Sequence, residues 1–144
     1  MLFNVDSNGP FLFLTIFYPN GGKDQPGCFQ GVNGTKIPSG CSHERSHQLL
    51  IDSIESRENG LKNVGLRCTD YGNYLDGHCF GEEQNLMGYF AQKPTSARSF
   101  YYFKTRDEKP FGLTEIESYG LMTGGAALFS LNILFCIIIN LSLN

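Results

Sequence analysis

The 144-residue sequence lacks a basic excess, a CxxC pair and any internal repeat. Its 11 Lys and Arg residues are outnumbered by 14 Asp and Glu residues, which gives a net charge of −3. A strongly basic surface is therefore excluded, and with it the usual electrostatic signature of a nucleic-acid partner. Because CxxC is missing, the cysteines must be interpreted from longer gaps.

Charge is also missing from one end of the chain. All charged side chains lie in the first 117 residues, and residues 118–144 carry none. The hydrophobic content of 41%, with 12 Phe and 7 Tyr, is sufficient for the core of one domain. Composition thus indicates a polar body followed by an apolar tail.

Four cysteines lie in the polar body, at Cys28, Cys41, Cys68 and Cys79. The short gaps favour local disulfides that join Cys28 to Cys41 and Cys68 to Cys79, although three connectivities are open, as are free thiols of a cytosolic protein. Asn33 begins an Asn-Gly-Thr glycosylation acceptor within the first gap. Together these features favour an extracellular, secreted protein.

Residues 121–143 form an apolar run about as long as the ~20 residues that a membrane helix needs. Asn132 and Asn140 weaken it, and no Lys or Arg follows it to mark a cytoplasmic side. Small residues before the run resemble a cleavable lipid-anchor signal. The run is expected to be a transmembrane or anchor helix, with a buried segment or a non-native extension as the alternatives.

Local patterns predict the elements of the body. Residues 11–17 read as a strand rather than a signal peptide, residues 18–22 as a turn, and residues 99–105 as an aromatic strand. A helix is expected from Ser42, as N-cap, to about residue 59, and residues 60–98 read as irregular. The expected apolar stripe of this helix is His43, His47, Leu50, Ile51 and Ile54. Residues 108–112 are expected to form a closing turn.

Residues 43–47 match HExxH, in which two imidazoles one helical turn apart hold zinc and the glutamate activates water. The residues around HExxH do not fit a zinc peptidase well. Leu50 occupies a position at which one zinc-peptidase motif has glycine, and Arg45 places a charge in a part of the helix that is usually apolar. A zinc peptidase therefore remains a minor alternative, with Glu55, Glu58 or Glu82 as a third ligand. The preferred interpretation assigns no metal and no cofactor.

A second, longer set of short sequence blocks indicates a different class of protein. They are FYPNGG at residues 17–22, QPGC at 25–28, CSHER at 41–45, DSI at 52–54, the pair Cys68 and Cys79, MGYFA at 87–91, and FYYFKT at 100–105 followed by KPFG at 109–112. In this order the chain resembles the pancreatic-lipase-type family, and most closely its insect lipase and phospholipase A1 members. The resemblance covers residues 17–112.

The resemblance implies an α/β class, here the C-terminal part of an α/β-hydrolase: its last strands, the helix of the catalytic histidine and the lid loop. His43 falls on the histidine of the family's Ser-Asp-His triad. The loop from Cys28 to Cys41 matches the lid, with Phe29, Val32 and Ile37 available to touch lipid, and its shortness resembles phospholipases. The implied partner is a lipid ester or a lipid–water interface, and no nucleic acid.

The GxSxG motif of the family's nucleophile is absent from these residues, and nothing before His43 resembles the triad aspartate. We therefore expect a divergent segment at 1–16, a partial lipase domain at 17–112, a linker at 113–120 and the tail at 121–143. The expected function is carboxylic-ester hydrolysis of lipids, represented by a fragment inactive alone. A catalytically silent lipid- or protein-binding module is the main alternative.

Overall fold

The computed structural model describes residues 2–5, 13–28, 40–114 and 117. Its centre is a five-stranded mixed sheet of order β1-β2-β5-β3-β4. The strands are β1 (Leu2–Val5), β2 (Phe13–Pro19), β3 (Val64–Arg67), β4 (Gln84–Leu86) and β5 (Arg98–Phe103). The helices are α1 (Cys41–Glu55) and α2 (Tyr71–Leu75), with 3-10 turns η1 (Asn20–Gly22) and η3 (Ser56–Asn59).

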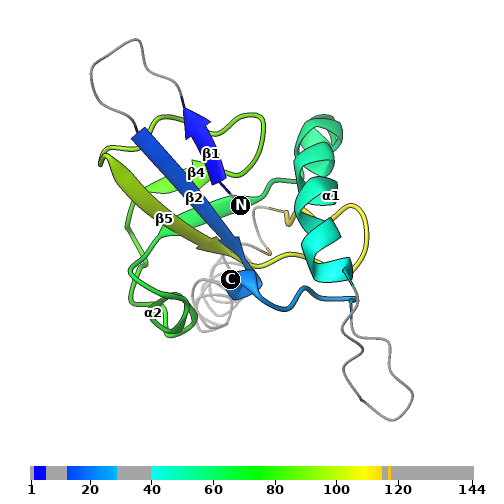
Figure 1. The fold of residues 1–144 in the computed structure, drawn as a ribbon, viewed down its shortest axis with the longest axis horizontal. Helices are drawn as coiled ribbons and strands as arrows, with labels where there is room; N and C mark the ends of the chain where they lie inside the picture. Colours follow the sequence, from blue (N-terminus) through cyan, green and yellow to red (C-terminus); the bar gives the residue numbers. More distant parts are fainter. Residues whose placement is uncertain (1, 6–12, 29–39, 115–116, 118–144) are drawn as a thin grey trace, which may run out of the picture.

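The predicted strands at residues 11–17 and 99–105 correspond to β2 and β5, within the described residues. They run parallel, with Phe17 opposite Tyr101, whereas every other pairing in the sheet is antiparallel. Parallel neighbours need a long crossover, and the chain between them supplies α1, α2, β3 and β4. Figure 1 shows β2 and β5 side by side, with α1 alongside the sheet and α2 near one end of it. A mixed sheet with helices on its faces is compatible with the predicted α/β class.

Alternating residues of β5 build a core on each face of the sheet. Tyr101 and Phe103 face one cluster, in which Phe17, Leu49 and Met87 are among the buried members. Tyr102 faces the other cluster, which includes the Cys68–Cys79 disulfide and Tyr74 of α2. Leu49 belongs to α1, so α1 packs on the first face and α2 on the second.

The predicted apolar stripe of α1 is wrong. The residues that α1 buries are Arg45, Leu49 and Asp52, whereas Ile51 and Ile54 are about half exposed, at 48% and 50%. Position 45 lies about 200° around the helix from position 43, so the buried face is nearly opposite. Hydropathy predicts the wrong buried face because Arg45 and Asp52 are charged, and they are buried through specific hydrogen bonds.

The predicted start of this helix is also corrected. α1 begins at Cys41 with Gly40 at its N-cap, and no side chain caps it. The Ser42 hydroxyl instead accepts the backbone N–H of Gln25 at 3.1 Å. The helix ends at Glu55 and continues as η3 to Asn59, close to the expected end.

Residues 60–98 are not irregular as predicted, because they hold β3, α2 and β4. The two strands are only four and three residues long, and they become strands because β3 pairs with distant β5 and β4 pairs with β3. The N-cap of α2 is Asp70, whose carboxylate accepts the backbone N–H of Asn73 at 2.9 Å. This capping residue was visible in the sequence.

Candidate functional site around His43

His43 lies in the first turn of α1 and its side chain is exposed. Its ring packs edge-on against that of His47, with the ring centroids 6.2 Å apart. Its backbone carbonyl accepts the Ser46 hydroxyl at 2.8 Å. The imidazole thus stands at the surface of the described structure, on a regular and well-anchored helical turn.

The N-terminal end of α1 is joined to the segment that follows β2. A disulfide links Cys28 to Cys41, the first helical residue. Gln25, which is buried, donates its backbone N–H to Ser42 and its side-chain amide to the carbonyl of Pro19 at 2.9 Å. The turn after β2 and the start of α1 therefore form one hydrogen-bonded unit.

Asn20 ties the same unit to the chain after β5. Its amide nitrogen donates to the Thr105 hydroxyl at 2.9 Å, and its side-chain oxygen accepts the Thr105 backbone N–H at 3.1 Å. Asn20 has φ of 51°, a left-handed conformation that asparagine tolerates better than most residues. The predicted turn at residues 18–22 is present as η1 and acts as a junction beside the His43 helix.

Arg45 is buried beneath this end of the helix. Its guanidinium stacks over the Phe111 ring at 4.2 Å, donates to the Asp107 carbonyl at 3.1 Å, and lies 3.7 Å from the Cys28 sulfur. Burial lowers the pKa of Arg45, and the nearby Asp107 carboxylate acts in the opposite direction. Arg45 thus connects the disulfide to the turn that closes the polar body.

Asp52 connects the C-terminal half of α1 to the same turn. One carboxylate oxygen accepts the backbone N–H groups of Phe111 and Gly112, at 3.0 and 3.3 Å, and the other accepts the Ser56 hydroxyl at 3.0 Å. On the surface, Lys109 pairs with Glu55 at 3.1 Å. The turn at residues 107–112 therefore holds α1 at both ends of the helix.

The sequence interpretation missed Asn20, Gln25, Arg45 and Asp52 as parts of this site. All four lie inside the blocks that carry the family resemblance, and Arg45 and Asp52 are seven positions apart, two turns of helix on one face. That spacing was the available signal, but both residues are charged and the predicted apolar stripe included neither.

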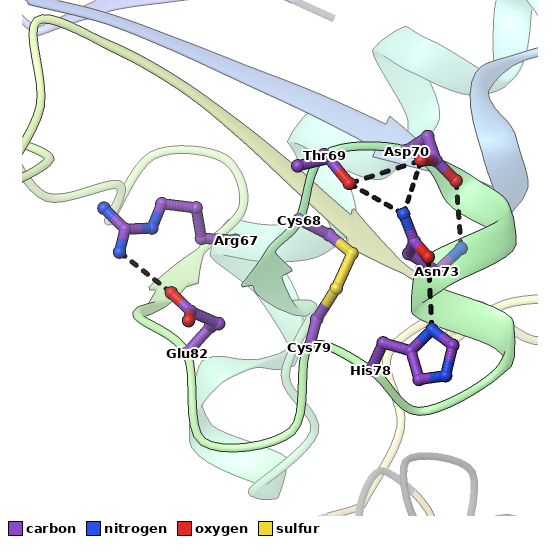
Figure 2. Close-up of a disulfide and its surroundings, with 8 residues drawn as sticks. All are labelled: Arg67, Cys68, Thr69, Asp70, Asn73, His78, Cys79 and Glu82. Carbon is purple, nitrogen blue, oxygen red and sulfur yellow. Dashed lines mark hydrogen bonds and ion pairs between the residues drawn. A yellow bond between two sulfur atoms is a disulfide. The ribbon is translucent and has the colours of Figure 1, made fainter.

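The second disulfide lies away from the His43 helix, on the other face of the sheet. It joins Cys68 to Cys79, so both disulfides follow the sequential pairing. Figure 2 shows its surroundings: Arg67 pairs with Glu82 at 2.9 Å, and Asn73 holds His78 through a 3.2 Å contact. These contacts stabilise the loop between the two cysteines.

Several predicted residues lie outside the described part of the chain. They are the lid residues Phe29, Val32 and Ile37, the acceptor Asn33, and the apolar tail at 121–143. Among the described helices, none is long and apolar enough to cross a membrane. The described residues also contain no group of three or more His, Cys, Asp or Glu side chains that could hold a metal ion.

Comparisons with known proteins identify the class of protein. A family model described as "Lipase" matches residues 15–111. Hepatic triacylglycerol lipase of Mus musculus is 36% identical over 109 residues, which cover 66% of this chain and 21% of the mouse protein. Lipoprotein lipase of Bos taurus is 36% identical over 108 residues, which cover 65% of this chain and 22% of the bovine protein.

A putative endothelial lipase of Crotalus adamanteus is 35% identical over 105 residues, covering 65% of this chain and 21% of the snake protein. The chain belongs to the lipase family, of the pancreatic-lipase type, as the sequence blocks predicted. It spans about a fifth of the length of these curated relatives.

Proposed function

We propose that this chain carries the histidine of a lipid-ester hydrolase and that His43 is its general base. In this reaction class a neutral imidazole takes the proton of a serine hydroxyl as that oxygen attacks the ester carbonyl. The same imidazole then returns the proton to the leaving alcohol. His43 is the residue of this chain that takes that role.

The observation that carries the proposal is the placement of His43 within the family-matched region. Its imidazole is exposed on the first turn of a helix that a disulfide, Arg45 and Asp52 hold in place. A base that must meet a nucleophile from another segment needs such accessibility and such rigid support.

The nucleophile and the acid of the triad are not assigned within these 144 residues, since the sequence contains no GxSxG motif. Triad residues act as a unit, and removing the nucleophile costs nearly as much as removing all three. The chain alone is therefore proposed to be inactive. In a complete hydrolase its role is to position the base.

The proposed substrate class is the carboxylic ester of a lipid. Relatives of this chain are named for triacylglycerol and lipoprotein substrates, and phospholipid remains a prediction from the short loop between Cys28 and Cys41. The two disulfides support an oxidising, extracellular compartment. A glycan at Asn33 and a membrane anchor at 121–143 remain predictions.

A chimera tests the assignment. The segment of mouse hepatic triacylglycerol lipase that precedes the matched region is placed before residue 15 of this chain, and hydrolysis of 4-nitrophenyl butyrate is measured. We expect turnover by the chimera and a loss of about 10⁴-fold or more in His43→Ala, in line with triad histidines elsewhere. His47→Ala, one helical turn away, is the matched control and should stay within about 3-fold.

The isolated 144-residue chain is assayed in parallel, and no turnover above background is expected. Turnover of the isolated chain that disappears in His43→Ala would contradict the proposed inactivity. An active chimera that is indifferent to His43→Ala would contradict the assignment of the base.

A further inference from the structure

The face of α1 that is turned away from the sheet carries exposed apolar side chains. Ile51 and Ile54 are 48% and 50% exposed, and Tyr89, beside the helix, is 71% exposed. Ile54 lies nine positions after Arg45, about 180° around the helix, so it is opposite the buried face. The described part of the chain has five large hydrophobic side chains that are exposed, and these are three of them.

These side chains form one patch because the segment around Tyr89 lies against α1. The Tyr89 backbone N–H donates to the Ser53 hydroxyl at 3.3 Å. A methyl group at Gly88 would lie 3.9 Å from the Leu50 side chain. Leu50 and Ile54 are four positions apart and are therefore neighbours on the helix surface. The outer patch of α1 is defined here as Leu50, Ile51, Ile54 and Tyr89.

The chain itself contains a segment that suits this patch. Residues 121–143 form an apolar run without a charged side chain. Exposure of such a run to water is unfavourable in proportion to its apolar area. The outer patch also carries no charge, so contact between the two would remove apolar surface of both from water and would leave no charge unpaired.

The described chain ends close to α1. Leu113 exchanges two backbone hydrogen bonds with Lys62, at 3.0 and 3.1 Å, and Lys62 follows η3, which continues α1. Glu117 pairs with Arg106 at 2.6 Å. Residues 118–120 separate Glu117 from the apolar run and can span at most about 11 Å. In helical form the run would be about 35 Å long, against about 22 Å for α1. It is therefore long enough to lie along the patch.

The short connection favours the chain's own tail over a second copy as the occupant. A segment joined to its binding surface by a short linker has an effective concentration in the millimolar range. A second copy of the chain would compete only at its concentration in solution. At micromolar protein concentration the intramolecular contact should therefore predominate.

We propose that, in water, residues 121–143 fold back onto the outer patch of α1. The tail then covers Ile51 and Ile54 and is itself shielded from solvent. A bilayer that takes up the tail as an anchor would uncover the patch. The inference does not depend on the role proposed for His43.

A native cysteine in the tail provides the probe for a test. Cys136 is the fifth cysteine of the chain, and the other four form the two disulfides. A nitroxide reagent therefore labels Cys136 alone in the ¹⁵N-labelled full chain. In buffer without lipid or detergent, the amide signals of residues 50–54 and 88–90 should lose most of their intensity through paramagnetic relaxation. Signals around Leu75 of α2, on the opposite face of the sheet, should keep theirs.

The double variant Ile51→Asp/Ile54→Asp places charges in the patch and should restore the intensity at residues 88–90. Leu75→Asp is the matched control, because Leu75 is also a half-exposed apolar residue of a helix, at 49%, and it should leave the intensity loss unchanged. Equal intensity loss in the parent and the double variant would overturn the proposal.

Two measurements on the parent chain require no variant to fold. Full intensity at residues 50–54 and 88–90 in the nitroxide-labelled chain would overturn the proposal. So would the same intensity loss in unlabelled ¹⁵N chain mixed with nitroxide-labelled ¹⁴N chain, because that result would assign the patch to a second copy.

Discussion

The carboxylate of Asp52 lies 3.0 Å from the backbone nitrogen of Phe111, a residue 59 positions later in the chain. This buried contact, with the 3.3 Å contact from the same oxygen to Gly112, joins α1 to the turn that closes the polar body. Arg45 reaches the same turn two helical turns earlier. The orientation of the His43 helix therefore depends on two buried charged residues.

Asp52→Ala should lower the free energy of unfolding by about 3 kcal/mol. The substitution leaves the buried N–H groups of Phe111 and Gly112 without an acceptor, and each unpaired group costs about 1–3 kcal/mol. Urea denaturation followed by far-ultraviolet circular dichroism measures the change. Glu55→Gln breaks only the exposed pair with Lys109 and should stay within about 0.5 kcal/mol of the parent. Equal losses in the two variants would contradict the role of Asp52.

Arg45→Lys should destabilise the chain by about 1–2 kcal/mol although the charge is kept. An ammonium lacks the flat guanidinium face that stacks on Phe111 and cannot reproduce the fixed geometry of the donors. Arg98→Lys is the control, because Arg98 is exposed and stacks on Phe100 at 5.2 Å. Its thermal midpoint should barely move, and a larger shift for Arg98→Lys than for Arg45→Lys would refute the argument.

Stability should fall between pH 10 and 12. Burial raises the pKa of Tyr74 to about 12, and burial also raises the pKa of Tyr71 and Tyr102. Above pH 10 the unfolded chain loses phenolic protons that the folded chain keeps, so the free energy of unfolding decreases as pH rises. For Tyr74 the loss amounts to about 2–3 kcal/mol.

Tyr74→Phe removes this ionisation, and the slope of unfolding free energy against pH should be shallower in the variant. Denaturation at a series of pH values supplies the slope, and absorbance at 295 nm reports tyrosine ionisation. Identical slopes for Tyr74→Phe and the parent chain would show that the buried hydroxyl does not control alkaline stability.

Gly88→Ala should be the more damaging of two glycine substitutions. Gly88 has φ of 100°, and a methyl group there would collide with the Ser53 side chain. Gly60 has φ of 70° but open space around the corresponding position. We expect a loss of about 1 kcal/mol for Gly60→Ala from backbone strain alone, and about 3 kcal/mol for Gly88→Ala. Adding Ser53→Gly to Gly88→Ala should recover part of the loss. Absence of any recovery would exclude the steric explanation.

Elements with strong local signals were predictable. The aromatic composition of residues 99–105 indicated β5, and the Pro-Asn-Gly-Gly turn marked the end of β2. Strands β3 and β4 were not predictable, because segments of three or four residues become strands only through pairing with distant partners. Local composition carries no record of those partners.

The position of His43 at the start of a helix was foreseeable from its motif, but the face on which the helix packs was not. The periodicity of Leu50, Ile51 and Ile54 favoured burial of the face that carries them. In the structure Ile51 and Ile54 on that face are about half exposed. Arg45 and Asp52 are buried with hydrogen-bond partners among the backbone groups of a turn far along the chain. Hydropathy ranks charged residues as exposed and does not include such partners.

The parallel pairing of β2 with β5 also has a consequence for the order of folding. Thr15 and Ser99 are neighbours in the sheet although almost the whole polar body separates them in the chain. The two disulfides, by contrast, close loops with sequence separations of only 13 and 11 residues. Contacts of low sequence separation form early, whereas non-local strand pairing is slow. During synthesis the two cysteine loops can therefore close before β5 has been synthesised and has paired with β2.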